Sequence, residues 1–314
     1  MKPTRISTTT STTPETTTTT TTTVPETTTE TTTTESTVMT VTISKTSVTS
    51  VREIGGAKLQ IIDKYGRTIE EWISKNGTPY IVTAPLVLGD TYTLREIDAP
   101  DGYAFADDII FSISEEGKLL DSNGEEIEKI RMQDERTSVS FSKKDLTGEQ
   151  ELTGAKMQIL DKTGSTVIEE WTSTNRVHVI NGKLNANEIY ILHEENAPNG
   201  YAYAADIQFM VNRNGKAVDE NGNEIVVTML DKAITAEISK TDITGEHEIG
   251  GATLRLLDKN RKTLEEWVSE EGKSHTVEST LNVGETYTLK EINAPDGYAY
   301  ASDITFSVAE DGTL

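Results

Sequence analysis

The 314-residue chain contains no cysteine, and its four histidines, His178, His193, His247 and His275, are scattered. Without cysteine, disulfide cross-links and thiolate metal sites are excluded. The histidines form no cluster with metal-ligand spacing, so we expect neither a bound metal nor another cofactor. Covalent reinforcement of this chain must therefore use other side chains.

Basic charge and long apolar runs are also lacking. The chain has 29 Lys and Arg against 52 Asp and Glu, for a net charge of −23. This acidity argues against nucleic acid and anionic membranes as partners. No run of 18 apolar residues occurs, and Met1-Lys2-Pro3 is followed by no apolar segment. Neither a membrane span nor a signal peptide is predicted, and we expect a piece of a longer protein.

The first 37 residues have almost nothing apolar to bury. From Thr8 to Thr34 the sequence is mostly threonine, interrupted by Pro14, Pro25 and glutamates. This composition predicts a disordered or extended segment at residues 1–37, either an O-glycosylated stalk or a plain flexible linker.

The rest of the chain contains three copies of one unit. Each copy begins with a short segment that carries a lysine, and the lysines are 98 and then 97 residues apart: Lys45, Lys143 and Lys240. A glutamate follows each lysine after 51 residues: Glu96, Glu194 and Glu291. An aspartate follows 89 or 88 residues after the first two lysines: Asp134 and Asp231. A period near 97 residues is typical of one small domain.

These repeats predict domains at residues 38–135, 136–232 and 233–314. By the same spacing, the aspartate of the third copy is due near position 328 or 329, beyond Leu314. The third domain is therefore expected to be truncated before its last strand.

Short alternating segments separated by turn residues fill each copy. In the first copy we predict strands over residues 40–45, 57–62, 68–73, 91–96, 108–113 and 128–134. Glycine-containing turns such as Asn76-Gly77 separate them, and no helical periodicity competes. The predicted fold class is all-β, with tandem β-sandwich domains. We interpret Trp72, Trp171 and Trp267 as core or sheet-packing residues.

The repeated lysine, glutamate and aspartate each lie on the apolar phase of a strand. Because neighbouring strand residues alternate faces, Lys45 aligns with Val41 and Ile43. The same count aligns Glu96 with Leu94 and Asp134 with Met132, and it holds for the equivalent residues of the other copies. Four charged or polar neighbours fall on the opposite phase and are interpreted as surface residues: Arg95, Lys144, His193 and Lys290.

Isolated charges are expensive to bury, so these side chains must pair or change protonation. Burial disfavours the charged forms of amines and carboxyl groups alike, which favours a neutral amine beside a protonated aspartate. The amine can then attack the carboxyl carbon, while the glutamate polarises the carbonyl and relays protons as water leaves. The product is a Lys–Asp amide. The alternative is a buried ion network in which no bond forms.

The most specific stretch of the repeat is Glu96 to Tyr103, which recurs as Glu194 to Tyr201 and Glu291 to Tyr298. With the order lysine, glutamate, aspartate, it resembles the Cna protein B-type domain and the SpaA-like prealbumin-fold modules of Gram-positive surface proteins and pilins. The resemblance covers about residues 38–314. It implies a transthyretin-like, inverse-immunoglobulin β-sandwich in which an intramolecular isopeptide bond joins the first and last strands.

The resemblance also assigns roles to the repeated residues. It implies bonded pairs Lys45–Asp134 and Lys143–Asp231, with Glu96, Glu194 and Glu291 as the catalytic acids. Lys240 would take an acceptor beyond Leu314. It further implies an extracellular protein at the surface or cell wall of a Gram-positive bacterium.

The favoured function is the structural stalk of a cell-surface adhesin or pilin-like protein, stiffened by autocatalytic isopeptide bonds. The alternative is a module whose repeats bind a host matrix ligand directly. We expect no enzyme acting on an external substrate, since the cross-linking is a single turnover. The partners considered are a host surface or matrix protein bound by domains outside this sequence, and a complementary strand for the third copy.

Two acidic loops, Asp121 to Glu125 and Asp219 to Asn223, faintly resemble calcium loops. They lack a bidentate glutamate at the required spacing, so we interpret them as hairpin turns. No Leu-Pro-x-Thr-Gly sorting signal occurs.

Overall fold

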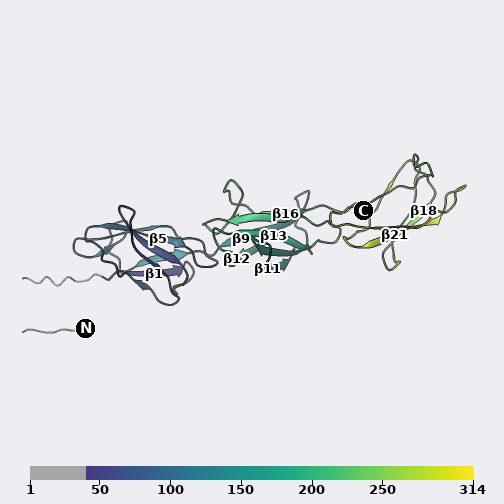
Figure 1. Ribbon diagram of the computed structural model, residues 1–314. Coiled ribbons are helices and arrows are strands. Elements are labelled where there is room, and N and C mark those ends of the chain that lie inside the picture. Colours follow the sequence, from purple (N-terminus) through teal and green to yellow (C-terminus); the bar gives the residue numbers. More distant parts are fainter. Residues whose placement is uncertain (1–39) are drawn as a thin grey trace, which may run out of the picture. The chain divides into compact units, whose positions relative to one another are not determined.

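The computed structural model describes residues 40–314 (Figure 1). The threonine-rich segment, predicted to be disordered or extended, lies outside these residues. Residues 40–314 form three tandem β-sandwich repeats and contain no helix, which confirms the predicted fold class for this part of the chain. None of the described residues therefore forms a helix with the length and apolar character needed to cross a bilayer.

The first repeat consists of two sheets. One has five strands in the order β3-β2-β5-β6-β7, and the other has three in the order β4-β1-β8. The strands are β1 (Thr42–Ser47), β2 (Lys58–Asp63), β3 (Thr68–Ile73), β4 (Tyr80–Ile81), β5 (Thr91–Asp98), β6 (Ile109–Ile113), β7 (Leu119–Leu120) and β8 (Ile130–Asp134).

The second repeat has the same two sheets, β11-β10-β13-β14-β15 and β12-β9-β16. Its strands are β9 (Ser138–Asp145), β10 (Lys156–Asp161), β11 (Val167–Thr172), β12 (His178–Asn181), β13 (Ile189–Asn196), β14 (Ile207–Val211), β15 (Ala217–Val218) and β16 (Val227–Asp231).

The third repeat, within the described residues, has sheets β19-β18-β21-β22 and β17-β20. Its strands are β17 (Glu237–Ile238), β18 (Thr253–Leu257), β19 (Thr263–Val268), β20 (His275–Thr276), β21 (Thr286–Asn293) and β22 (Ile304–Ser307).

The first and last strands of each complete repeat are parallel neighbours. In the first repeat β1 pairs with β8, with Lys45 opposite Met132 and Ser47 opposite Asp134. In the second repeat β9 pairs with β16 in the same way, with Lys143 opposite Met229; both strands are labelled in Figure 1, β9 in teal and β16 in green. This pairing sets the lysine strand beside the aspartate strand, although about 90 residues separate the two along the chain.

The core of each repeat lies between its two sheets. In the first repeat it includes Leu59, Leu94, Phe111, Ile130 and Met132, each no more than 1% exposed. These residues occupy alternate positions of their strands, so their side chains meet between the sheets as in other sandwiches. The polar residues that share this phase must therefore lie in or beside the core.

The predicted strands of the first repeat match six observed strands to within a few residues, and two further strands were missed. Both β4 and β7 contain only two residues, too few for an alternating pattern to appear. The stack of Trp72 on Tyr80 of β4, with ring centroids 4.2 Å apart, connects the two sheets. Trp171 and Trp267 stack in the same way on His178 and His275. The interpretation of the tryptophans as packing residues is confirmed.

The acidic loops have the turn geometry expected for hairpins. The Asp121 side chain accepts hydrogen bonds from the backbone N–H groups of Asn123 (2.8 Å) and Glu125 (3.0 Å), and Gly124 adopts a φ of 83°. Asp219 accepts equivalent bonds in the second repeat. Within residues 40–314 no group of three or more His, Cys, Asp or Glu is arranged to hold a metal ion.

Candidate functional site

The three polar side chains of the first repeat meet inside the sandwich. Lys45 Nζ on β1 lies 2.7 Å from Glu96 Oε1 on β5 and is in hydrogen-bond contact with Asp134 Oδ1 at the end of β8. The side chains of Lys45, Glu96 and Asp134 are at most 2% exposed. The prediction that they point inward is confirmed, and the structure brings together all three residues selected from the sequence.

The second repeat reproduces this arrangement. Lys143 Nζ lies 2.7 Å from Glu194 Oε1 and contacts Asp231 Oδ1, and the three side chains are at most 3% exposed. In the third repeat Lys240 Nζ lies 3.5 Å from Glu291 Oε1. The Lys240 side chain is 15% exposed, and the described residues contain no strand equivalent to β8 or β16 beside it. Two full sets and one lysine–glutamate pair are therefore present.

A backbone hydrogen bond orients each glutamate. The Glu96 carboxylate accepts the N–H of Ala106 through Oε2 at 2.7 Å. The equivalent bonds are 2.9 Å from Ala204 to Glu194 and 2.6 Å from Ala301 to Glu291. With Oε2 held in this way, Oε1 faces the lysine amine in every copy.

Burial changes the protonation of the acids. Desolvation raises the pKa of Glu96, against the opposing effect of the Lys45 ammonium. Desolvation and the neighbouring Glu96 carboxyl raise the pKa of Asp134 against the opposing effect of the Lys45 ammonium, and the net result is a pKa of about 7. The pKa of Asp231 rises to about 6 for the same reasons. Within the described residues, the second carboxyl oxygen, Oδ2, of Asp134 and of Asp231 is buried without a hydrogen-bond partner. A protonated aspartate is therefore accessible near neutral pH.

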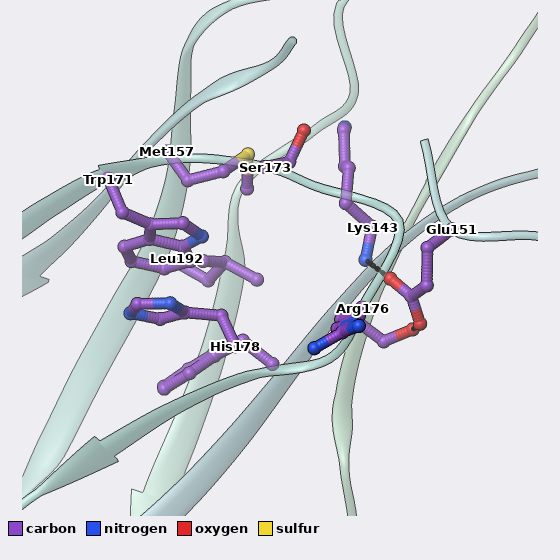
Figure 2. Close-up of a pocket in the computed structure, with 10 residues that line it drawn as sticks. Lys143, Glu151, Met157, Trp171, Ser173, Arg176, His178 and Leu192 are labelled. Atoms are coloured by element: carbon purple, nitrogen blue, oxygen red, sulfur yellow. Dashed lines mark hydrogen bonds between the residues drawn. The ribbon is translucent and has the colours of Figure 1, made fainter. Parts of the chain in front are cut away.

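Apolar side chains keep bulk water away from the site. In the second repeat a small cavity of about 10 Å³ adjoins the lysine (Figure 2). Lys143 and Glu151 lie on one side of it, and the stacked rings of Trp171 and His178 lie on the other. This volume is about that of a single water probe.

A further glutamate contacts the lysine strand in every repeat and was missed by the sequence reasoning. Glu53 Oε2 accepts the backbone N–H of Lys45 at 2.7 Å. Glu151 and Glu248 do the same for Lys143 (3.0 Å) and Lys240 (2.8 Å). Each glutamate follows its lysine by eight residues, a repeated spacing that could have revealed the set.

Chemically, each complete site places an amine against a carboxyl group, beside a second carboxyl group and away from water. The second carboxyl group can donate to and accept from both reactants, so amide formation between lysine and aspartate is feasible in this geometry. Both reactive lysines are buried, since Lys45 and Lys143 are 2% and 3% exposed.

Parallel first and last strands, two facing sheets and a buried lysine–glutamate pair define a prealbumin-like β-sandwich module. The chain matches the family described as SpaA, prealbumin-like fold domain, over residues 39–126, 137–224 and 234–314. It therefore belongs to this family, as the resemblance of the repeated motif predicts. A search of curated proteins found no match.

Several solved structures are similar to this chain. The Bacillus anthracis TIE protein has a TM-score of 0.40 and 20% identity, covering 88% of this chain and 49% of its own. The pilus adhesin SpaC from Lactobacillus rhamnosus GG, in its open conformation, has a TM-score of 0.37 and 15% identity, covering 88% and 39%. The shaft pilin SpaA from the same organism has a TM-score of 0.29 and 13% identity, covering 62% and 97%. This chain thus spans about half or less of the first two proteins.

Proposed function

We propose that this protein is a structural stalk at the bacterial cell surface, whose two complete repeats each form a Lys–Asp isopeptide bond without an external catalyst. One observation carries the proposal. The amine of the first strand contacts the carboxyl group of the last strand beside a buried glutamate, and this arrangement occurs twice, at Lys45–Asp134 and Lys143–Asp231.

The bond forms by condensation. In the first repeat, the neutral amine of Lys45 attacks Cγ of protonated Asp134, while protonated Glu96 donates a hydrogen bond to the carbonyl oxygen. The new C–N bond replaces the C–OH bond. A proton from the amine passes through Glu96 to the departing hydroxyl, which leaves as water. Glu96 ends as it began, so it acts as an acid–base catalyst in a single turnover.

Two features of the site favour this reaction over an ion pair. Strand pairing holds both reactants in contact, which replaces a bimolecular encounter by an intramolecular step. Burial removes the bulk water that would stabilise the charged forms, and it raises the pKa of Asp134 to about 7. The cavity beside Lys143 has room for the water that the reaction releases.

The position of the bond supports the stalk role. It would connect the first and last strands of a repeat, so a tension on the chain would pass from β1 to β8 through the amide. The intervening strands would carry none of it. Membership in the SpaA prealbumin-like family supports an extracellular location on a Gram-positive bacterium.

Intact-mass measurement of the full chain tests the proposal. We expect a mass smaller than the sequence mass by two waters. Glu96→Ala and Glu194→Ala should each regain one water, and the double variant should regain both. Glu71→Ala serves as a control. It removes an exposed carboxylate on β3 that pairs with Lys58 on β2, and it should keep both water losses. A wild-type mass equal to the sequence mass would refute bond formation and leave the lysines ion-paired.

A further inference from the structure

The strand that carries the reactive lysine is supported differently along its two edges. Along one edge of β1, the parallel partner β8 pairs with residues 43–47. Along the other edge, the antiparallel partner β4 pairs only with Thr42 and Ile43. At Lys45 itself, this second edge has no strand partner in the described sheet. Another group must therefore hydrogen-bond to the backbone N–H and carbonyl oxygen of Lys45.

Glu53 and the residue after it provide that group. Glu53 Oε2 accepts the N–H of Lys45 at 2.7 Å, and Oε1 accepts the hydroxyl of Ser44 at 2.5 Å. The N–H of Ile54 donates to the carbonyl oxygen of Lys45 at 2.8 Å. Three hydrogen bonds thus hold two consecutive residues of β1 from the edge that β4 leaves free.

The other repeats contain the same contact. In the second repeat, Glu151 accepts the N–H of Lys143 and the hydroxyl of Ser142, and Leu152 N–H donates to the Lys143 carbonyl at 2.6 Å. In the third, Glu248 accepts the N–H of Lys240, and Ile249 N–H donates to its carbonyl at 2.8 Å. The loops between lysine and glutamate in the second and third repeats share the sequence Asp-x-Thr-Gly-Glu, whereas the loop of the first repeat, residues 46–52, lacks it. Two different loop sequences therefore lead to the same contact.

Burial around the lysine depends on this contact. Ser44 and Thr46 lie on the phase of β1 opposite to Lys45, where alternation predicts exposure, yet they are 1% and 0% exposed. Thr46 and Glu53 form an isolated bridge, so the Glu53 segment covers this edge of the strand. The glutamate therefore fixes the backbone of the lysine and helps to exclude water from it.

We propose that Glu53 and Glu151 are positioning residues for isopeptide bond formation, an inference that rests on the proposed function. They act through the lysine backbone, because the ionic partners of the Lys45 amine are Glu96 and Asp134. A carboxylate suits this role, since its two oxygens accept one N–H and one hydroxyl at once through charge-assisted hydrogen bonds. A lysine whose backbone can shift spends less time with its amine in attacking geometry, and small displacements of reacting groups lower rates strongly.

The test measures how fast each bond forms in the full chain. The protein is synthesised cell-free, samples are quenched at intervals in acid and denaturant, and digestion with mass spectrometry quantifies the cross-linked peptide of each repeat. We expect Glu53→Ala to slow the Lys45–Asp134 bond by about tenfold or more while the Lys143–Asp231 bond keeps the wild-type rate. Glu151→Ala should produce the reverse pattern, so each repeat is the control for the other.

A conservative variant separates positioning from general stability. Glu53→Gln keeps an oxygen for the N–H of Lys45 and offers an amide hydrogen to Ser44, so it should restore most of the rate. Hydrogen exchange on the β2 and β5 peptides, measured in a Glu96→Gln background that forms no bond in this repeat, reports how much of the Glu53→Ala chain is unfolded there. The slowing should exceed what that unfolded fraction explains.

The outcomes distinguish this inference from the proposed function. If the wild-type chain loses no water, both fail. If the wild-type chain forms its bonds and Glu53→Ala forms them equally fast, the positioning role alone is overturned. A slowing fully explained by unfolding, or a Glu53→Gln rate as low as that of Glu53→Ala, would also overturn it.

Discussion

Replacing Glu96 by glutamine should remove the bond of the first repeat with the smallest change in shape. Glutamine can still accept the N–H of Ala106, which Glu96 accepts at 2.7 Å, and Lys45 and Asp134 can remain paired. It cannot relay a proton between the amine and the departing hydroxyl. The variant should therefore fold with an unbonded first repeat, while the second repeat keeps its bond.

The size of the stability loss follows from the loop that the bond closes. Lys45 and Asp134 are 89 residues apart in the sequence. Treated as a disulfide closing a loop of that length, the bond stabilises the repeat by about 4 to 5 kcal/mol through the entropy of the unfolded chain. For a domain of this size each kcal/mol corresponds to several degrees, so the melting temperature should fall by roughly 20 to 30 °C.

Calorimetry of the full chain measures this loss, because the repeats should melt as separate transitions. We expect one transition to move down in Glu96→Gln and the equivalent second transition to move in Glu194→Gln. Glu71→Gln is the matched control, since its side chain is 43% exposed in a surface ion pair with Lys58. Its effect should stay within about 0.5 kcal/mol.

Two results would refute this reasoning. A Glu96→Gln chain that still lacks two waters would show that the glutamate is not the proton relay. A chain that regains one water but melts within a few degrees of wild type would show that the bond does not restrict the unfolded state as a loop closure does.

Three further predictions concern pH and calcium. The reactive pair is a neutral amine beside a protonated aspartate, and it carries one proton fewer than an ammonium beside a protonated aspartate. Bond formation should therefore slow as the pH falls through the pKa of the aspartate, which is about 7 for Asp134 and about 6 for Asp231. In a cell-free pH series, both bonds should therefore form more slowly toward acid pH; a rate that does not fall below a pH of about 6 would contradict this. In an unreacted first repeat, the stability from the raised pKa of Asp134 should be present below its unfolded pKa of 3.8 and be lost as the pH rises to about 7. Calcium should leave every melting transition unchanged, because backbone N–H groups already occupy the Asp121 and Asp219 carboxylates; a calcium-dependent shift would show that these loops are ion sites.

The alternation of apolar and polar residues predicted the longer strands of the sandwich and the inward direction of the repeated lysine, glutamate and aspartate. The periodicity works for β2, β5 and β8 because one face of each meets the core and the other meets solvent. It placed Glu96 and Asp134 among core residues, and both are at most 1% exposed. Repetition of the same residues at fixed spacing then grouped them with Lys45. Three-dimensional contact among these residues could be inferred because they share one phase and one repeat.

The strand β1 shows where this reasoning fails. Alternation assigned one buried face to it, yet Ser44 and Thr46 on the other face are also buried. Glu53 hydrogen-bonds to Ser44 and forms a bridge with Thr46 on this face. Strand phase does not identify this loop residue, which only its recurring spacing from the lysine could have revealed. The parallel pairing of β1 with β8 is likewise a long-range contact that neither strand encodes locally. The resemblance implied a bond between the first and last strands, and the structure adds that these strands are parallel neighbours.

Lys240 shows a second limit, since the third lysine has the same phase as the first two but a different environment. Its side chain is 15% exposed, against 2% for Lys45 and 3% for Lys143. The two more buried lysines are covered by β8 and β16, and the described part of the third repeat has no such strand. Strand phase predicts direction, while the degree of burial depends on which neighbours are present.

The parallel arrangement of β1 and β8 determines how each repeat should respond to force. Tension applied to the ends of a repeat enters at β1 and leaves at β8. In the bonded form it passes through the amide between Lys45 and Asp134, so the 89-residue interval cannot extend. In Glu96→Gln the same tension must be resisted by the hydrogen bonds between the two strands, and their rupture releases the interval.

Single-molecule pulling of Glu96→Gln should then show one added extension that the wild-type chain lacks. At about 3.4 Å per residue, this extension should be roughly 300 Å. An equal extension in the wild-type chain would mean that the repeat bears load without a covalent link, and the stalk would owe its strength to strand pairing alone.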